Sequence, residues 1–211
     1  MKHALAIVVV VAIVAVAATA AWWFLRGPAP AATANGEISE SAAGRAQQKL
    51  DAIVAHGAAP PGSRPPLTTA LSEDEINSHF QYRMGAKIPK GVYQVRFSIH
   101  AGRVMGNAVV DFDEVKAGQR KPINPLLDYM LTGKRPVSGA GAFTSSNGSG
   151  VFHLEQVSIG SISLSGTTLD LLMRHVVLPR YPKAAIDRPF ELPNRIDRLV
   201  LEEGRVVIYQ R

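Results

Sequence analysis

The densest group of acidic side chains lies at the end of a strand-like segment, at Asp111, Asp113 and Glu114. Two acids two positions apart on a strand share a face, as a calcium site or an acid/base pair requires. The regularly spaced further ligands of an EF-hand loop do not follow them. We therefore interpret these carboxylates as the charged end of a strand rather than as a catalytic or metal site.

The other residue types capable of chemistry form no recognisable motif. The chain has no HExxH zinc helix, GxSxG nucleophile elbow or GxxxxGK(S/T) phosphate loop. It has no cysteine, which excludes disulfides, cysteine-ligated zinc and thiol catalysis. We predict a non-catalytic protein without a cofactor or metal, and only a cleft that joined histidines and carboxylates would favour an enzyme. The histidines beyond the N-terminal segment fall on different expected elements, at His56, His79, His100, His153 and His175.

The formal net charge of +6 is carried by scattered residues. A nucleic-acid-binding surface normally concentrates lysine and arginine in a stripe with interleaved aromatics, whereas the nearest candidates, 119–121 and 174–183, are short. We therefore expect no nucleic acid partner. Basic residues spread beside a membrane anchor suit a weak attraction to anionic lipid headgroups instead.

An uncharged run of 22 residues from Ala4 to Leu25 dominates the N-terminus. About 20 such residues cross the hydrocarbon core of a bilayer as a helix, and the aromatic cluster Trp22-Trp23-Phe24 suits the headgroup level. We predict a single-pass signal anchor over residues 1–26, with the N-terminus cytoplasmic and the remaining chain extracytoplasmic, in the periplasm. The alternative is a secreted protein cleaved near Ala20, because Ala18-Thr19-Ala20 has the small-x-small form of a cleavage site.

The segment after the anchor is expected to be a tether. Residues 27–66 contain an alanine- and proline-rich spacer, a weakly amphipathic helix over 37–56 and a linker with four prolines. A capping box then begins the folded domain, since Ser72 and Glu75 have the spacing of that motif. We predict a helix from there to about Met84 and a domain over residues 67–211.

Three hairpins are expected within this domain. The first spans 92–113, and its alternation turns Tyr93, Val95, Phe97 and Ile99 to one buried face. The second spans 137–158 and turns at Asn147-Gly148, a dipeptide that tolerates positive φ. Asn147-Gly148-Ser149 is also a glycosylation sequon, which we interpret as turn chemistry. The third hairpin spans 196–208.

Two helices are expected between the hairpins, at 125–131 and at 168–178. The apolar residues of the second helix cover more than one face, so this helix either lies in the central core, the interpretation we favour, or lines something apolar. The predicted fold class is α+β. An N-terminal transmembrane helix precedes an antiparallel sheet of three hairpins, about six strands, curved over two or three helices.

Four stretches of the sequence resemble known families: the N-terminal anchor, Leu71-Ser72-Glu73-Asp74-Glu75-Ile76-Asn77, the hairpin VYQVRFSIHAGRVMGNAVVDF and the closing PFELPNRIDRLVLEEGRVVI. Together they are similar to bacterial membrane-anchored extracytoplasmic lipid-binding-like domains, namely the YpmS-like, AsmA-like and other tubular-lipid-binding-like proteins. The resemblance implies a strongly curved sheet over helices, with an apolar groove for an acyl chain. It implies these groove residues: Leu126, Leu127, Met130, Leu172, Met173 and Val176. The chain departs from the larger AsmA-like proteins in being too short to bridge two membranes.

Two functions are therefore expected from different classes. The first is the binding or shielding of a lipid ligand in an apolar groove. Such binding requires no covalent step. The second is a structural or interaction module that recruits a protein partner to a membrane-associated assembly through a sheet edge or hairpin. An internal apolar cavity of several hundred Å³ would favour the first, and a filled core with an exposed apolar patch would favour the second.

Overall fold

The structure is a computed structural model that describes residues 38–60, 62–85, 88–116, 132–174 and 186–211. The predicted anchor, the spacer, the helix at 125–131 and the end of the helix at 168–178 lie outside these residues. Within the described segments, none of the helices has the length and apolar character needed to cross a membrane.

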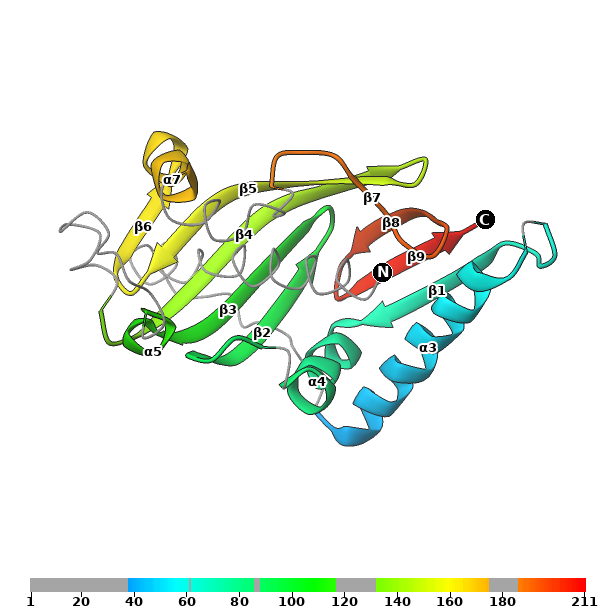
Figure 1. Ribbon diagram of the computed structural model, residues 1–211, viewed down its shortest axis with the longest axis horizontal. Coiled ribbons are helices and arrows are strands. Elements are labelled where there is room, and N and C mark those ends of the chain that lie inside the picture. The colour runs from blue at the N-terminus through cyan, green and yellow to red at the C-terminus, as the bar shows by residue number, and fades with distance from the viewer. Residues whose placement is uncertain (1–37, 61, 86–87, 117–131, 175–185) are drawn as a thin grey trace.

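The fold is α+β, as predicted, and its strands form two antiparallel sheets (Figure 1). The larger sheet has six strands in the order β2-β3-β4-β5-β6, with the short β7 paired to β5. The smaller sheet has the order β1-β9-β8. The strands are β1 (Leu67–Ser72), β2 (Val92–His100), β3 (Arg103–Asp111), β4 (Lys134–Ser146), β5 (Ser149–Ile159), β6 (Ile162–Ser165), β7 (Phe190–Glu191), β8 (Ile196–Glu202) and β9 (Arg205–Gln210). The described helices are α3 (Glu40–Ala58), α4 (Glu73–Arg83), α5 (Phe112–Lys116) and α7 (Gly166–Leu172).

All three predicted hairpins are present, but they do not share one sheet. The third hairpin, β8-β9, pairs with β1 over Leu67 to Ser72, a strand that the sequence did not indicate. The two sheets meet along β4 and β8, where the Ser145 hydroxyl accepts a hydrogen bond from Leu199 N (2.7 Å) and donates one to Leu199 O (2.8 Å). The expected single sheet of three hairpins is thus replaced by two sheets joined at one edge.

Local signals place α4 and the hairpin turns as predicted. The capping box is formed, because Ser72 Oγ accepts from Glu75 N (3.2 Å) and Glu75 Oε2 accepts from Ser72 N (3.0 Å). Asn147 and Gly148 both have positive φ, 52° and 78°, as a tight two-residue hairpin turn requires. These elements need only neighbouring residues to be specified.

Helix α3 differs from the expected tether, because it packs on the domain instead of standing apart from it. Ala42, Ala43 and Ala46 are at most 1% exposed, and such small side chains let α3 lie close against α4. Further along the helix, Ile53 joins a core cluster with Leu71 and residues of the smaller sheet. The folded unit therefore includes a helix that precedes the expected boundary at residue 67.

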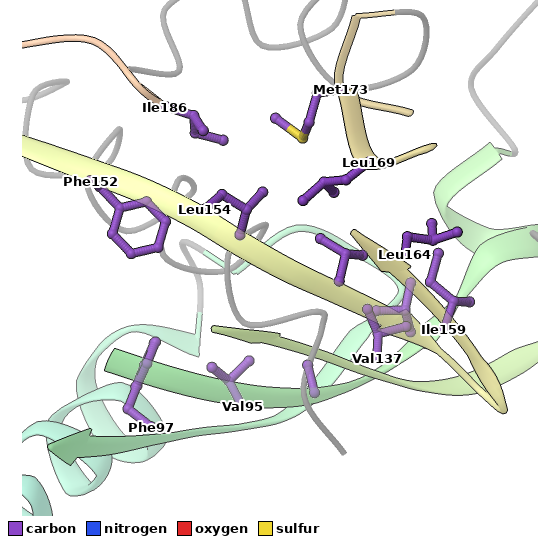
Figure 2. Packing of buried hydrophobic residues seen from close by; sticks show 13 residues of the cluster. Val95, Phe97, Val137, Phe152, Leu154, Ile159, Leu164, Leu169, Met173 and Ile186 are labelled. Atoms are coloured by element: carbon purple, nitrogen blue, oxygen red, sulfur yellow. The ribbon is translucent and has the colours of Figure 1, made fainter. Parts of the chain in front are cut away.

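The main core lies on one face of the larger sheet and is covered in part by α7. Figure 2 shows Leu154 of β5 near Leu169 of α7, with Met173, which directly follows α7, and Ile186 on the same side of the sheet. Residues of β2, β3, β4 and β6 complete this cluster. The smaller cluster fills the space between α3 and the β1-β9-β8 sheet.

Candidate functional site

The carboxylates of Asp111, Asp113 and Glu114 make hydrogen bonds around the start of a short helix. Asp111 Oδ1 accepts from the backbone N–H groups of Asp113 (3.2 Å) and Glu114 (3.1 Å), which begin α5. Asp113 accepts from Gly133 N (3.2 Å), and Glu114 accepts from the Tyr93 hydroxyl. These contacts agree with a charged strand end. In the part of the chain that the structure describes, no three His, Asp or Glu side chains converge as metal ligands would.

The histidines lie apart, as their sequence positions suggest. His100 pairs with Glu203 (2.7 Å) and His153 with Asp187, both at exposed positions on different strands. His56 is buried at the end of α3, where Nε2 lies 3.3 Å from Arg211 O. Each contact joins parts of the chain that pack together, so these histidines have a structural role in the fold.

Of the predicted groove residues, only Leu172 and Met173 lie within the residues that the structure describes. Leu126, Leu127, Met130 and Val176 lie outside the described residues, and Leu172 lies in the last turn of α7. Met173 is 7% exposed and packs into the main core (Figure 2). Met173 therefore contributes to the core, whereas Leu171 of α7 is 53% exposed.

The structure instead shows a cleft with a mixed apolar and polar lining, at the other edge of the larger sheet. A space of about 460 Å³ opens between the end of α4, residues 88–91 and the edge strand β2. This volume lies in the range of small-molecule sites, about 300–1,000 Å³. The apolar lining residues, which we call the cleft floor, are Phe80, Ile88, Pro89, Val92 and Val95.

The cleft floor is the outer surface of the main core. Val95 belongs to the core cluster and is 4% exposed, while Ile88 and Val92 pack against that cluster from outside. Phe80 of α4 meets Phe97 of β2 edge to face, with ring centroids 4.6 Å apart. A ligand in the cleft would thus contact apolar surface that continues into the core.

Polar groups surround the cleft floor and form its rim. The Tyr93 hydroxyl donates to Glu114, and this hydrogen bond is the largest cause of a raised pKa of Tyr93. Partial desolvation and the negative charges of Glu114 and Asp111 raise that pKa further. The Lys134 ammonium lies 5.5 Å from the centroid of the Tyr93 ring, and Lys90 also lines the cleft. An apolar floor under a polar rim suits an amphipathic ligand.

A bulge in β2 places Tyr93 at the rim of the cleft. This corrects the prediction that Tyr93 lies on the buried face of the strand. The register between β2 and β3 shifts between Tyr93 and Arg96, and Gln94 has a φ of 54°. An extra residue in a strand reverses the alternation on its far side, so Tyr93 is 42% exposed instead of sharing the buried face of Val95. The sequence offered no local signal for this bulge, because Pro89 and Gly91 indicate only a turn before the strand.

Comparison with known proteins assigns the chain to no family. No protein-family model matches it, and no curated protein matches it.

Proposed function

We propose that this protein is a non-catalytic, membrane-anchored extracytoplasmic domain that binds a lipid acyl chain in the cleft beside β2. The observation that carries the proposal is the continuity of the cleft floor with the main core, at Ile88, Val92 and Val95. Such a surface removes methylenes from water without having to supply hydrogen bonds to them. Polar groups of the rim, among them Tyr93 and Lys90, would hold the polar end of the lipid.

The size of the cleft makes the proposed binding energetically reasonable. Each buried methylene contributes about 0.8 kcal/mol, so six of them contribute about 5 kcal/mol before the costs of binding. A ligand held by burial alone needs no catalytic residue. The predicted anchor over Ala4 to Leu25 would keep the cleft close to its source of lipid.

A second function, an interaction module, is favoured by a different observation. Leu171 of α7 and Ile162 of the neighbouring β6 are exposed, by 53% and 38% respectively. Exposed apolar side chains on two elements that contact each other offer a surface for a protein partner. This position is separate from the cleft, so the two functions call for different variants.

Photo-crosslinking from the bilayer tests the lipid proposal. The full chain is reconstituted into phosphatidylcholine vesicles that contain a phospholipid with a diazirine near the end of its acyl chain. After irradiation, adducts are located by peptide mass spectrometry. We expect adducts within residues 80–95 in addition to those in the predicted anchor, because an acyl chain in the cleft contacts Phe80 and Val92.

A pair of matched variants makes the result specific. Ile88→Arg introduces a charge into the cleft floor and should abolish adducts within 80–95, whereas Leu171→Arg makes the same kind of change at an exposed site and should preserve them. Adducts confined to the anchor would contradict acyl binding by the domain. If Leu171→Arg abolished binding of a protein partner and Ile88→Arg left that binding unchanged, the interaction module would be favoured.

A further inference from the structure

A second groove, to which four arginines contribute, lies at one end of the smaller sheet. The turn between β8 and β9 lies at the other end of that sheet. The groove has a volume of about 480 Å³ and is bordered by the start of β1, the start of β8, the end of β9 and the segment before β1. The lining residues that matter here, the arginine groove, are Arg64, Arg195, Asp197, Arg198, Tyr209 and Arg211. None of them lines the cleft beside β2.

The charges of this groove are unbalanced. Asp197 is the one acidic side chain among its lining residues, and it pairs with Arg211. In the described part of the chain, the guanidinium groups of Arg64, Arg195 and Arg198 form no ion pair with a carboxylate. Cations gathered in a concave surface attract an anion more strongly than the same charges spread over a convex one.

Two of these arginines also have a structural role, which leaves most of their donors unused. Arg195 Nη1 donates to Ala59 O (3.0 Å) and Arg64 Nη1 approaches Ala55 O (3.4 Å), both at the carboxyl end of α3. Positive charge is favoured there by the helix dipole. A guanidinium carries five N–H donors, so a single carbonyl contact leaves each group able to bind an anion.

Arg198 stacks on a tyrosine of the neighbouring strand. Its guanidinium lies over the Tyr209 ring, with Cζ 4.3 Å from the ring centroid. Thr68, Tyr209 and Arg198 are direct cross-strand neighbours on β1, β9 and β8, so they form one row across the sheet. Stacking occupies the flat face of the guanidinium and leaves its edge donors free to form paired hydrogen bonds with a phosphate.

We propose that the arginine groove binds a phosphate-bearing anion, either the headgroup of an anionic phospholipid or a free phosphate. Four arginines line this one groove, and a guanidinium forms paired hydrogen bonds with phosphate oxygens. This site goes beyond acyl-chain binding and does not depend on it, because the cleft and the arginine groove share no residue.

Calorimetric titration of the full chain in a non-ionic detergent tests the proposal. One titration uses inorganic phosphate and the other uses dihexanoyl phosphatidylglycerol below its micelle concentration. Arg198→Ala should weaken binding about tenfold or more, the loss expected for charge-assisted hydrogen bonds. Arg198→Lys keeps the charge but loses the planar fork, so it should weaken binding as well. Arg188→Ala, an equal change of charge at an exposed position outside the groove, should have no effect.

The two titrations distinguish the sources of the anion. Phosphate binding that depends on Arg198 supports a free phosphate site, and binding of phosphatidylglycerol alone with the same dependence supports a headgroup site. Absence of binding in both titrations would overturn the proposal. So would equal losses in Arg198→Ala and Arg188→Ala, or phosphatidylglycerol binding that Arg198→Ala leaves unchanged, since such binding would occur through the acyl chains. A thermal midpoint of Arg198→Ala and Arg198→Lys close to that of the unmodified chain shows that both variants are folded.

Discussion

The side-chain amide of Asn77 hydrogen-bonds both backbone groups of Phe97. Asn77 Nδ2 donates to Phe97 O (2.8 Å), and Asn77 Oδ1 accepts from Phe97 N (2.7 Å), with all four groups buried. Phe97 lies on β2, the edge strand of the larger sheet, so a helix side chain takes the place of a neighbouring strand there. The Ser145 hydroxyl likewise hydrogen-bonds both backbone groups of Leu199 on β8. These edges are thereby closed to pairing with another chain at these positions.

Replacing Asn77 should therefore destabilise the protein more than the loss of a single polar side chain usually does. Asn77→Ala leaves two buried backbone groups without a partner, and we expect a loss of about 2–4 kcal/mol in the free energy of unfolding. Urea unfolding of the full chain in detergent, followed by circular dichroism, measures it. Asn107→Ala, at an exposed position on β3, should change stability by less than about 0.5 kcal/mol. Equal losses in the two variants would contradict the edge-capping role.

Two glycines of α3 provide a test of how closely this helix packs. A Cβ atom on Gly57 would lie 2.5 Å from Asn194 O, whereas a Cβ atom on Gly44 would meet nothing within 4 Å. We expect Gly57→Ala to destabilise by about 1–3 kcal/mol through overpacking against backbone. Gly44→Ala should stabilise by about 0.5–1 kcal/mol, because alanine is the better helix former. Thermal unfolding compares the two, and a stabilising Gly57→Ala would show that α3 does not dock as described.

The sequence predicted those parts of the fold that neighbouring residues specify. Ser72 and Glu75 are three residues apart and Asn147-Gly148 is a dipeptide, so both signals can be recognised locally. The pairing of β1 with β9 joins Leu67 to Gln210, and no local pattern specifies such a contact. The docking of α3 was missed for a related reason. Its contact residues are alanines, which give a weak amphipathic pattern even though their small size permits close packing.

The candidate sites were less predictable than the fold. The cleft depends on the bulge at Gln94, and a strict period of two placed Tyr93 on the wrong face. The arginine groove gathers Arg64, Arg198 and Arg211, which are far apart in the chain and converge only through the β1-β9-β8 sheet. In the sequence alone, the same arginines contribute to a charge that looks mild and scattered.

Glu75 joins the capping box to α3, and its removal should weaken both. Its carboxylate, which is 6% exposed, accepts from Lys49 Nζ at 2.7 Å and from Ser72 N at 3.0 Å. We expect Glu75→Gln to destabilise by about 1–3 kcal/mol, since it leaves the Lys49 ammonium facing an uncharged amide. Asp74→Asn, in the same helical turn, is the matched control and should cost less, about 0.3–1 kcal/mol, because it removes one negative charge from the helix N-terminus. Urea midpoints that shift equally would argue against a special role for the Lys49 contact.

The rim of the cleft carries a tyrosine whose ionisation reports on its contact with Glu114. The pKa of Tyr93 is raised above the ordinary tyrosine value of about 10, first by the hydrogen bond to Glu114, then by partial desolvation and by the charges of Glu114 and Asp111. The folded state therefore holds this proton more tightly than the unfolded state does. Its contribution to stability is complete below pH 10 and is lost as the pH rises through the raised pKa of the folded protein.

Glu114→Gln should consequently lower the pKa of Tyr93 towards 10, because it removes both the charged acceptor and its repulsion of the phenolate. The measurement is phenolate absorbance during a titration to high pH. Subtracting the curve of Tyr93→Phe isolates Tyr93 from the other tyrosines, and Glu114→Gln is compared with its own Tyr93→Phe double variant. The midpoint of the Tyr93 difference curve should move to lower pH in Glu114→Gln. An unchanged midpoint would mean that Tyr93 and Glu114 are not in contact in solution, and the polar rim of the cleft would then be arranged differently.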